Sequence, residues 1–150
     1  MPTTKKPAES LGYLAETVGF PVRLVQVDIF KDFADAMGDL EVTPAIFSVM
    51  EVLRMNPGMT QSKLAAIVKL DHSSVVPMLD KLGKRGIVSR QASTTDRRHN
   101  HLHLTDEGKQ LLKVATSRVR LHNDRFMAPL TAKERITLIA LLNKLTAKRT

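Results

Sequence analysis

The stretch MTQSKLAAIVKLDHSSVVPMLDKLGKRG, residues 59–86, decides the fold. Thr60 and Asp71 each stand just before a run with helical apolar spacing, which is where an N-cap side chain belongs. In both cases an apolar residue precedes the cap and another lies four positions into the helix, as in a hydrophobic staple. The two staple pairs are Met59 with Leu64 and Leu70 with Val75. The pattern predicts two short helices joined by a turn of a few residues, which is a helix-turn-helix.

The second of these helices has two unlike faces. Its apolar residues recur at i, i+3, i+4 and i+7 and are predicted to face the core: Val75, Met78, Leu79 and Leu82. A rotation of about 100° per residue places another set on the outside: Ser73, Pro77, Lys81 and Lys84. Hydroxyl and cationic groups on an exposed helix suit a DNA major groove. We expect Pro77 to kink the helix, because proline removes one helical hydrogen bond and clashes with the preceding turn. At that position we expect apolar contact, such as with a thymine methyl, rather than base readout through hydrogen bonds.

A basic turn between two short strands follows the helix-turn-helix. Gly86 ends the second helix, residues 87–90 have the composition of a strand, and a return strand is expected at about 100–104. The turn between the strands contains Asp96, Arg97 and Arg98. We expect an arginine to enter the negative potential of a minor groove, and Asp96 to orient it through a charge-assisted hydrogen bond.

Helices are predicted on both sides of this unit. A first helix covers about 21–37, with a possible start near residue 11, and Gly38 is its expected C-cap. A second begins at the N-cap Thr43 and is ended by the turn after residue 55. Two more are expected after Thr105 and Thr131, running to about residues 126 and 145. Residues 1–10 are polar with two prolines and are predicted to form a flexible arm.

Composition limits the classes of function. The chain has 150 residues, enough for one domain, and a formal charge of +8 that favours a polyanionic partner. Residues 69–98 contain seven basic and three acidic residues, a net +4, so half of the excess lies in a fifth of the chain. Without cysteine there is no disulfide framework and no thiolate metal site. No signal peptide or membrane span is apparent, and we expect a cytoplasmic protein.

These features together resemble the MarR family of winged-helix bacterial transcription regulators, over about residues 11–145. The family's wing pattern is an aspartate, any residue, an arginine, a hydrophobic strand ending in Leu-Thr, and a glycine three residues on. This chain matches it with Asp96, Arg98, Leu102, Leu104, Thr105 and Gly108. The resemblance implies a mainly α fold with a small two-stranded β-wing (α+β), in one domain covering residues 11–150. Within it, the winged helix-turn-helix would span about 43–105 and the dimerisation helices about 11–38 and 106–147.

The resemblance also implies a function. We expect a sequence-specific homodimeric repressor that binds a pseudo-palindromic operator in double-stranded DNA. The candidate DNA-binding residues are Ser62, His72, Ser73, Ser74, Pro77, Lys81, Lys84, Arg90, Asp96, Arg97 and Arg98. The apolar stripe Ile136, Ile139, Leu142 and Leu145 agrees with a dimer, because it exceeds what a compact winged helix buries.

Relatives of this kind respond to small aromatic ligands, some of them coenzyme A thioesters. A similar effector is expected here, in a pocket formed by the first, second and fifth helices. Candidate lining residues are Phe30, Phe33, Met37, Phe47 and Met50, with Arg23 or His122 as a polar anchor. Each of these residues also has a plain interpretation as part of the core or the surface.

Three alternatives remain open at this level. His99, His101 and His103 alternate along the predicted return strand, and such spacing is compatible with a metal site, although we expect no metal and no cofactor. An enzyme is disfavoured, because the sequence has no Gly-rich phosphate loop and no paired carboxylates next to a histidine. A non-sequence-specific nucleic-acid-binding protein without an effector is the nearest rival to a regulator.

Overall fold

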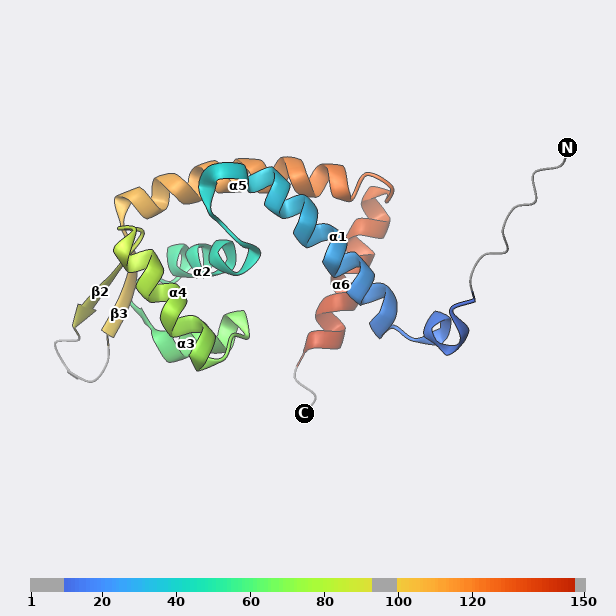
Figure 1. The fold of residues 1–150 in the computed structure, drawn as a ribbon, viewed down its shortest axis with the longest axis horizontal. Helices are drawn as coiled ribbons and strands as arrows, with labels where there is room; N and C mark the ends of the chain where they lie inside the picture. The colour runs from blue at the N-terminus through green and yellow to red at the C-terminus, as the bar shows by residue number, and fades with distance from the viewer. Residues whose placement is uncertain (1–9, 93–99, 148–150) are drawn as a thin grey trace, which may run out of the picture.

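The computed structural model describes residues 10–92 and 100–147. In chain order these residues form η1 (Gly12–Glu16), α1 (Gly19–Met37), η2 (Gly38–Leu40), α2 (Pro44–Met55), β1 (Met59–Thr60), α3 (Gln61–Val68), α4 (His72–Lys84), β2 (Val88–Ala92), β3 (Asn100–Leu104), α5 (Asp106–Phe126) and α6 (Ala132–Thr146), where η marks a 3-10 helix. Figure 1 shows a lobe made of α2, α3, α4 and the strands at one end of the molecule, and α1 and α6 at the other. The long helix α5 runs along one edge and connects the two.

Helix starts follow the predicted caps. The side chains of Thr43, Thr60, Asp71, Thr105 and Thr131 each accept a hydrogen bond from a backbone N–H in the first turn of the helix that follows. Gly38 caps α1 with φ at 53°, a conformation that glycine adopts without a side-chain clash. The first helix does not extend back to residue 11, however. Thr17 is extended, so residues 12–16 form the separate turn η1.

The wing contains one more strand than predicted. The strand order is β1-β3-β2, with both pairings antiparallel. The expected pairing of β2 with β3 is present, with Val88 opposite Leu104 and Arg90 opposite Leu102. In addition, Met59 and Thr60 pair with Leu102 and His101. A strand of two residues is too short to produce an alternating pattern, which explains why the sequence predicted only two strands.

The core belongs to the lobe that contains the helix-turn-helix. Leu53, Leu64, Leu79, Leu82 and Leu102 are each at most 1% exposed. On β3 the predicted alternation is confirmed, since Leu102 and Leu104 are buried while His101 and His103, which point to the other face, are half-buried.

The two helices at the other end bury little within one chain. None of the residues of α6 is buried, and in α1 only Phe33 and Met37 are. Apolar side chains with about half of their surface exposed follow both helices. These faces are available to a partner.

Candidate nucleic-acid interface

The turn between α3 and α4 sets the angle at which α4 leaves the core. Lys69 has φ at 51° and ends α3 in the left-handed region. Asp71 then caps α4: one carboxylate oxygen accepts the Ser74 N–H and the Ser73 hydroxyl, both at 2.7 Å. These bonds lower the pKa of Asp71 below its ordinary value, and the bond from the Ser73 hydroxyl has the largest effect. The first turn of α4 is therefore fixed by an ionised carboxylate.

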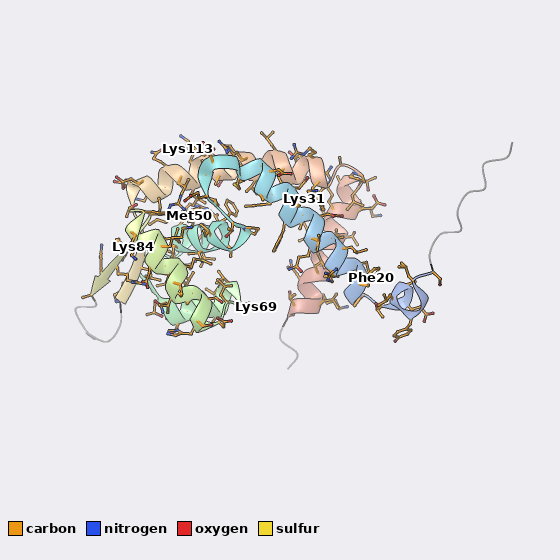
Figure 2. The ribbon with its side chains drawn as sticks, viewed as in Figure 1. Phe20, Lys31, Met50, Lys69, Lys84 and Lys113 are labelled. Atoms are coloured by element: carbon orange, nitrogen blue, oxygen red, sulfur yellow. The ribbon has the colours of Figure 1, made fainter. Side chains whose placement is uncertain are left out.

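The two faces of α4 are the predicted ones. Val75, Leu79 and Leu82 are buried and Met78 packs on the core. The opposite face carries Ser73, Pro77, Lys81 and Lys84, and the predicted DNA-binding residues His72 and Ser74 flank it in the first turn; all six are exposed. Ser62, at the start of α3, is exposed as well. Figure 2 shows Lys84 at the end of α4 nearest the wing.

Pro77 is tolerated in the middle of α4. The helix is unbroken from His72 to Lys84 with Pro77 inside it. We expected Pro77 to kink the helix, and α4 continues through Pro77 without interruption. Its exposed ring presents an apolar surface between the hydroxyl and the amine groups of this face.

An ion pair connects the wing to α4. Arg90 on β2 places Nη1 2.6 Å from Oδ1 of Asp80 on α4. Arg90 was predicted to bind DNA, and its exposed guanidinium lies beside the exposed face of α4. Asp80 was missed by the sequence analysis, since a partner ten residues away across a helix and a strand leaves no periodic signal.

The base of the wing is joined tightly to α5. The Thr105 hydroxyl, which accepts the Gly108 N–H at 3.0 Å, also donates to the carbonyl of Gly86 at 2.5 Å. At Gly108 a Cβ atom would stand 2.3 Å from the carbonyl oxygen of Ile87. The glycine of the wing pattern is therefore needed for the close approach of α5 to the chain that enters β2.

Two arginines that the sequence analysis missed fix the segment between α1 and α2. Arg85 donates to the carbonyl oxygens of Leu40 and Glu41, both at 3.1 Å. Arg118 on α5 donates to the carbonyl oxygen of Met37 at 2.6 Å. Backbone carbonyls as acceptors cannot be seen in a sequence pattern, so neither contact had a signal.

The tip of the wing lies outside the described residues. This applies to Asp96, Arg97 and Arg98, which were predicted to contact or support contact with DNA, and to His99. Of the other two histidines, His101 donates from Nδ1 to the carbonyl oxygen of Gly58 at 2.6 Å. His101 thus braces the turn between α2 and β1. Within the described part of the chain, no group of three or more metal-ligating side chains is found.

The residues predicted to bind an effector fall into different environments. Met37 and Met50 are 2% and 0% exposed and belong to the core, so a ligand would meet them only after the core repacked. Phe33 is also buried, with its ring 6.3 Å from the ring of the half-buried Phe47. Arg23 and Phe30 are exposed on α1. The spacing of apolar residues could not distinguish core positions from pocket positions.

His122 is the unusual member of that set. It is 4% exposed, its ring meets Phe33 edge-on at 5.7 Å, and its Nδ1 has no hydrogen-bond partner among the described residues. The nearest carboxylate oxygen, on Asp32, is 3.9 Å from that nitrogen. His122 thus lies at the crossing of α1 and α5, inside an aromatic cluster.

A groove separates α1 from the lobe of the helix-turn-helix. Its volume is about 640 Å³, and it is lined by Gln26, Phe30, Thr43, Pro44, Ala45, Ser48, Val68 and Leu70. Phe30 is the one residue of the predicted effector set that lines it. The lining is mostly apolar, with the hydroxyl and amide groups of three side chains among it.

A helix-turn-helix with a polar, cationic recognition face, followed by an antiparallel wing, defines a winged-helix DNA-binding protein. The sequence profile described as "MarR family" matches residues 42–99. The chain is also 38% identical over 135 residues to the putative transcriptional regulatory protein for the hcr operon of Thauera aromatica, covering 89% of this chain and 81% of that protein. The chain belongs to the MarR family and is a DNA-binding transcription regulator.

Two solved structures of the transcriptional repressor CouR have the same fold. CouR bound to a 23-mer DNA duplex has a TM-score of 0.88 and 34% identity, covering 92% of this chain and 98% of that chain. CouR bound to p-coumaroyl-CoA has a TM-score of 0.86 and 31% identity, covering 95% and 100%. The fold of this chain is thus similar to that of a repressor seen with DNA and with an aromatic acyl-CoA.

Proposed function

We propose that this chain is a homodimeric repressor that binds a pseudo-palindromic operator and is released by an aromatic acid or its coenzyme A thioester. The observation that carries the proposal is the exposed face of α4, where Ser73, Pro77 and Lys81 stand clear of the core beside the wing. Ser62, His72, Ser74, Lys84 and Arg90 extend this face, and Asp96, Arg97 and Arg98 would add the wing tip.

A second copy accounts for the apolar faces of α1 and α6. On α6, Ile136, Ile139 and Leu145 are 70%, 54% and 63% exposed. An apolar groove of about 460 Å³ between α1 and α6 is lined by Pro21, Val22, Val25, Gln26, Ile29, Leu138 and Leu142. Surfaces this apolar are rarely left in water by a monomer. Pairing through a two-fold axis would cover both helices and present two α4 helices to successive half-sites.

The effector would occupy the groove between α1 and the lobe that carries α4. An aromatic acyl group suits its apolar lining, with Phe30 at one wall and Thr43 and Ser48 as hydrogen-bonding groups. A ligand there would contact both the dimer helix α1 and the N-terminal end of α2. If the effector binds more tightly to one orientation of the lobe that carries α4 than to another, its binding changes the affinity for the operator.

The test is selection of bound fragments from the source genome by the purified protein at about 0.15 M salt, repeated with aromatic acids and their coenzyme A thioesters. The expected result is one short palindrome, lost in the presence of one compound. Uniform recovery of fragments would identify a non-sequence-specific binder and contradict the proposal.

A variant separates the effector groove from the DNA face. Ala45→Phe would fill the groove, so we expect operator binding within about twofold of the unaltered protein and loss of the response to the compound. A full response in this variant would place the effector elsewhere.

No helix within the described ranges combines the length and apolarity of a membrane span. We assign the protein to the cytoplasm and assign it no catalytic step, and its MarR relatives are transcription regulators, not enzymes.

A further inference from the structure

A cationic hollow lies on the seam between α2 and α5, away from α4. One part, of about 310 Å³, is lined by Arg54 of α2 and by a row of α5 residues that includes Lys109, Lys113 and Arg120. The adjoining part, of about 490 Å³, is lined by Leu53, Pro57, His103 and Leu104. Arg54 and Lys109 line both parts, so the two hollows lie next to each other. We call them together the α5 trough.

The charge of the α5 trough is one-sided. Four cationic side chains line it, and no carboxylate does among the residues described. Glu51 pairs with Arg54 at 2.6 Å and Asp106 pairs with Lys109 at 2.9 Å, both from outside the lining. Lys113 and Arg120 have no ion-pair partner in the described ranges. Five other arginines each have a carboxylate oxygen within 4.0 Å: Arg85, Arg90, Arg118, Arg125 and Arg135.

The two cations without an ion-pair partner in the described ranges, Lys113 and Arg120, lie on the same side of α5 as Lys109. Lys109 and Lys113 are four residues apart, where like charges destabilise a helix, and Asp106 offsets the charge of Lys109 only. Arg120 continues the same side, and the hydroxyl groups of Thr116 and Ser117 lie between it and Lys113. A bound anion would relieve this repulsion and accept a hydrogen bond from the Thr116 hydroxyl, because the Ser117 hydroxyl already donates to the Lys113 carbonyl oxygen at 3.3 Å.

The α5 trough is separate from the two surfaces already described. It shares no lining residue with the exposed face of α4 or with the groove beside α1. In Figure 2, Lys113 lies on α5 at the edge of the molecule and Lys84 lies on α4, nearer the wing. An anion bound by Lys113 and Arg120 would therefore occupy a different site from the one proposed for the operator at α4.

The geometry selects an extended anion. Lys113 and Arg120 are seven residues apart, which is about 10 Å along a helix, so their long side chains can reach the two ends of one triphosphate. A guanidinium and an ammonium group on the same side of a helix, with one hydroxyl donor between them, match the oxygens of successive phosphates better than a single carboxylate. The adjoining part adds the apolar surfaces of Leu53, Pro57 and Leu104 and the ring of His103.

We propose that the α5 trough binds a small molecule that carries a chain of condensed phosphates. Nucleoside polyphosphates and inorganic polyphosphate share this chemistry. The phosphates would lie between Lys113 and Arg120, with Lys109 and Arg54 at the junction of the two parts. In a nucleoside polyphosphate, the base would cover the apolar surface beside His103.

Calorimetric titration of the full-length, DNA-free protein with ATP and with tripolyphosphate, at about 0.15 M salt, tests the proposal. We expect saturable binding with one site per chain. Lys113→Ala combined with Arg120→Ala should weaken it by about tenfold or more. Lys81→Ala combined with Lys84→Ala removes the same charge from α4 and should change it by less than about twofold. Tighter binding of ATP than of tripolyphosphate would assign the second part to a base, and equal binding would assign recognition to the phosphates alone.

Three results would overturn the proposal. The first is the absence of saturable binding of either probe. The second is an equal loss in the two double variants, since that would reflect net charge alone. The third is a loss of operator affinity by the α5 double variant as large as its loss of ATP affinity, because the trough would then belong to the DNA interface. All four altered residues are exposed, and circular dichroism on each variant verifies the fold.

Discussion

Arg90 of β2 and Asp80 of α4 form an ion pair of 2.6 Å beside the exposed face of α4 that we propose to bind DNA. Because both side chains are exposed, the pair should contribute less than about 1 kcal/mol to stability. We expect Arg90→Ala to leave the melting temperature nearly unchanged and to weaken operator binding by about tenfold, since it removes a cation next to the recognition helix. Mobility-shift titration measures the affinity.

The control for this prediction is Asp80→Asn. It breaks the same ion pair and keeps the guanidinium. If Arg90 contacts DNA, Asp80→Asn retains most of the affinity that Arg90→Ala loses. Equal losses in the two variants would show that the ion pair, through the position of the wing, is what matters.

Gly108 is the residue whose replacement should damage the fold most directly. A Cβ atom there would approach the Ile87 carbonyl oxygen to 2.3 Å and Leu104 Cδ2 to 2.9 Å, so the start of α5 would have to move. Gly108→Ala should cost about 1–3 kcal/mol of unfolding free energy, as overpacking usually does. Urea denaturation measures it. Gly83→Ala is the matched control in a helix, with its nearest atom at 3.8 Å, and it should be neutral or stabilising.

Asp71 makes stability depend on pH through the cap of α4. Its pKa is lowered from 3.8 in the folded protein by the Ser73 and Ser74 bonds. A group with a depressed folded pKa contributes stability above its unfolded pKa, and this contribution is lost as pH falls through the folded value. Asp71→Asn keeps an acceptor at the N-cap but does not titrate.

The unfolding free energy of the unaltered protein should therefore fall relative to that of Asp71→Asn as pH drops below about 4. Above about pH 5 the difference should be constant. The pKa of Glu134 is also lowered, mainly by the Thr131 backbone N–H, but both proteins share that group and its effect cancels. Parallel acid titrations of urea midpoints measure the difference, and identical curves would contradict the role of the ionised cap.

Local signals explain why much of the fold could be predicted. Caps at Thr60, Asp71 and Thr105 depend on a side chain and an N–H three residues on, which a sequence displays directly. The alternation of Leu102 and Leu104 with the histidines likewise follows from strand geometry alone. The faces of α4 were predictable for the same reason.

Contacts across the fold were not predictable in this way. Asp80 with Arg90, and Arg118 with the Met37 carbonyl, join residues whose proximity depends on packing of whole elements. Met50 could not be placed from the sequence either: methionine is common in the walls of ligand pockets, but Met50 is completely buried in the core. Apolar spacing identifies the inner face of a helix and does not reveal whether that face meets a ligand or another side chain.

Lys84 is expected to contact a phosphate rather than a base. It is exposed in the last turn of α4, beyond Ser73 and Pro77 at the other end of the recognition face. Lys84→Ala should weaken binding to all DNA sequences alike and reduce the slope of log affinity against log salt by about one unit. Titrations of operator and unrelated duplexes at several salt concentrations measure both. A changed base preference would instead assign Lys84 to readout.

The apolar face of α6 provides the test of dimerisation. Ile139 is 54% exposed in one chain and Leu142 is 41% exposed, and both belong to the apolar stripe that the proposed second copy would cover. Ile139→Asp should place a charge in that interface, shift the protein to monomer in analytical ultracentrifugation, and weaken operator binding at least about a hundredfold, because one half-site is then bound alone.

Thr137→Glu is the matched control on the same helix. At about 100° per residue, Thr137 lies on the polar side of α6 with Lys133 and Lys144, away from the apolar stripe. It should remain dimeric and bind operator normally. If Ile139→Asp also remains dimeric, α6 is not the interface, and its exposed side chains need another partner. If both variants become monomeric, added negative charge on α6 rather than the apolar stripe controls assembly.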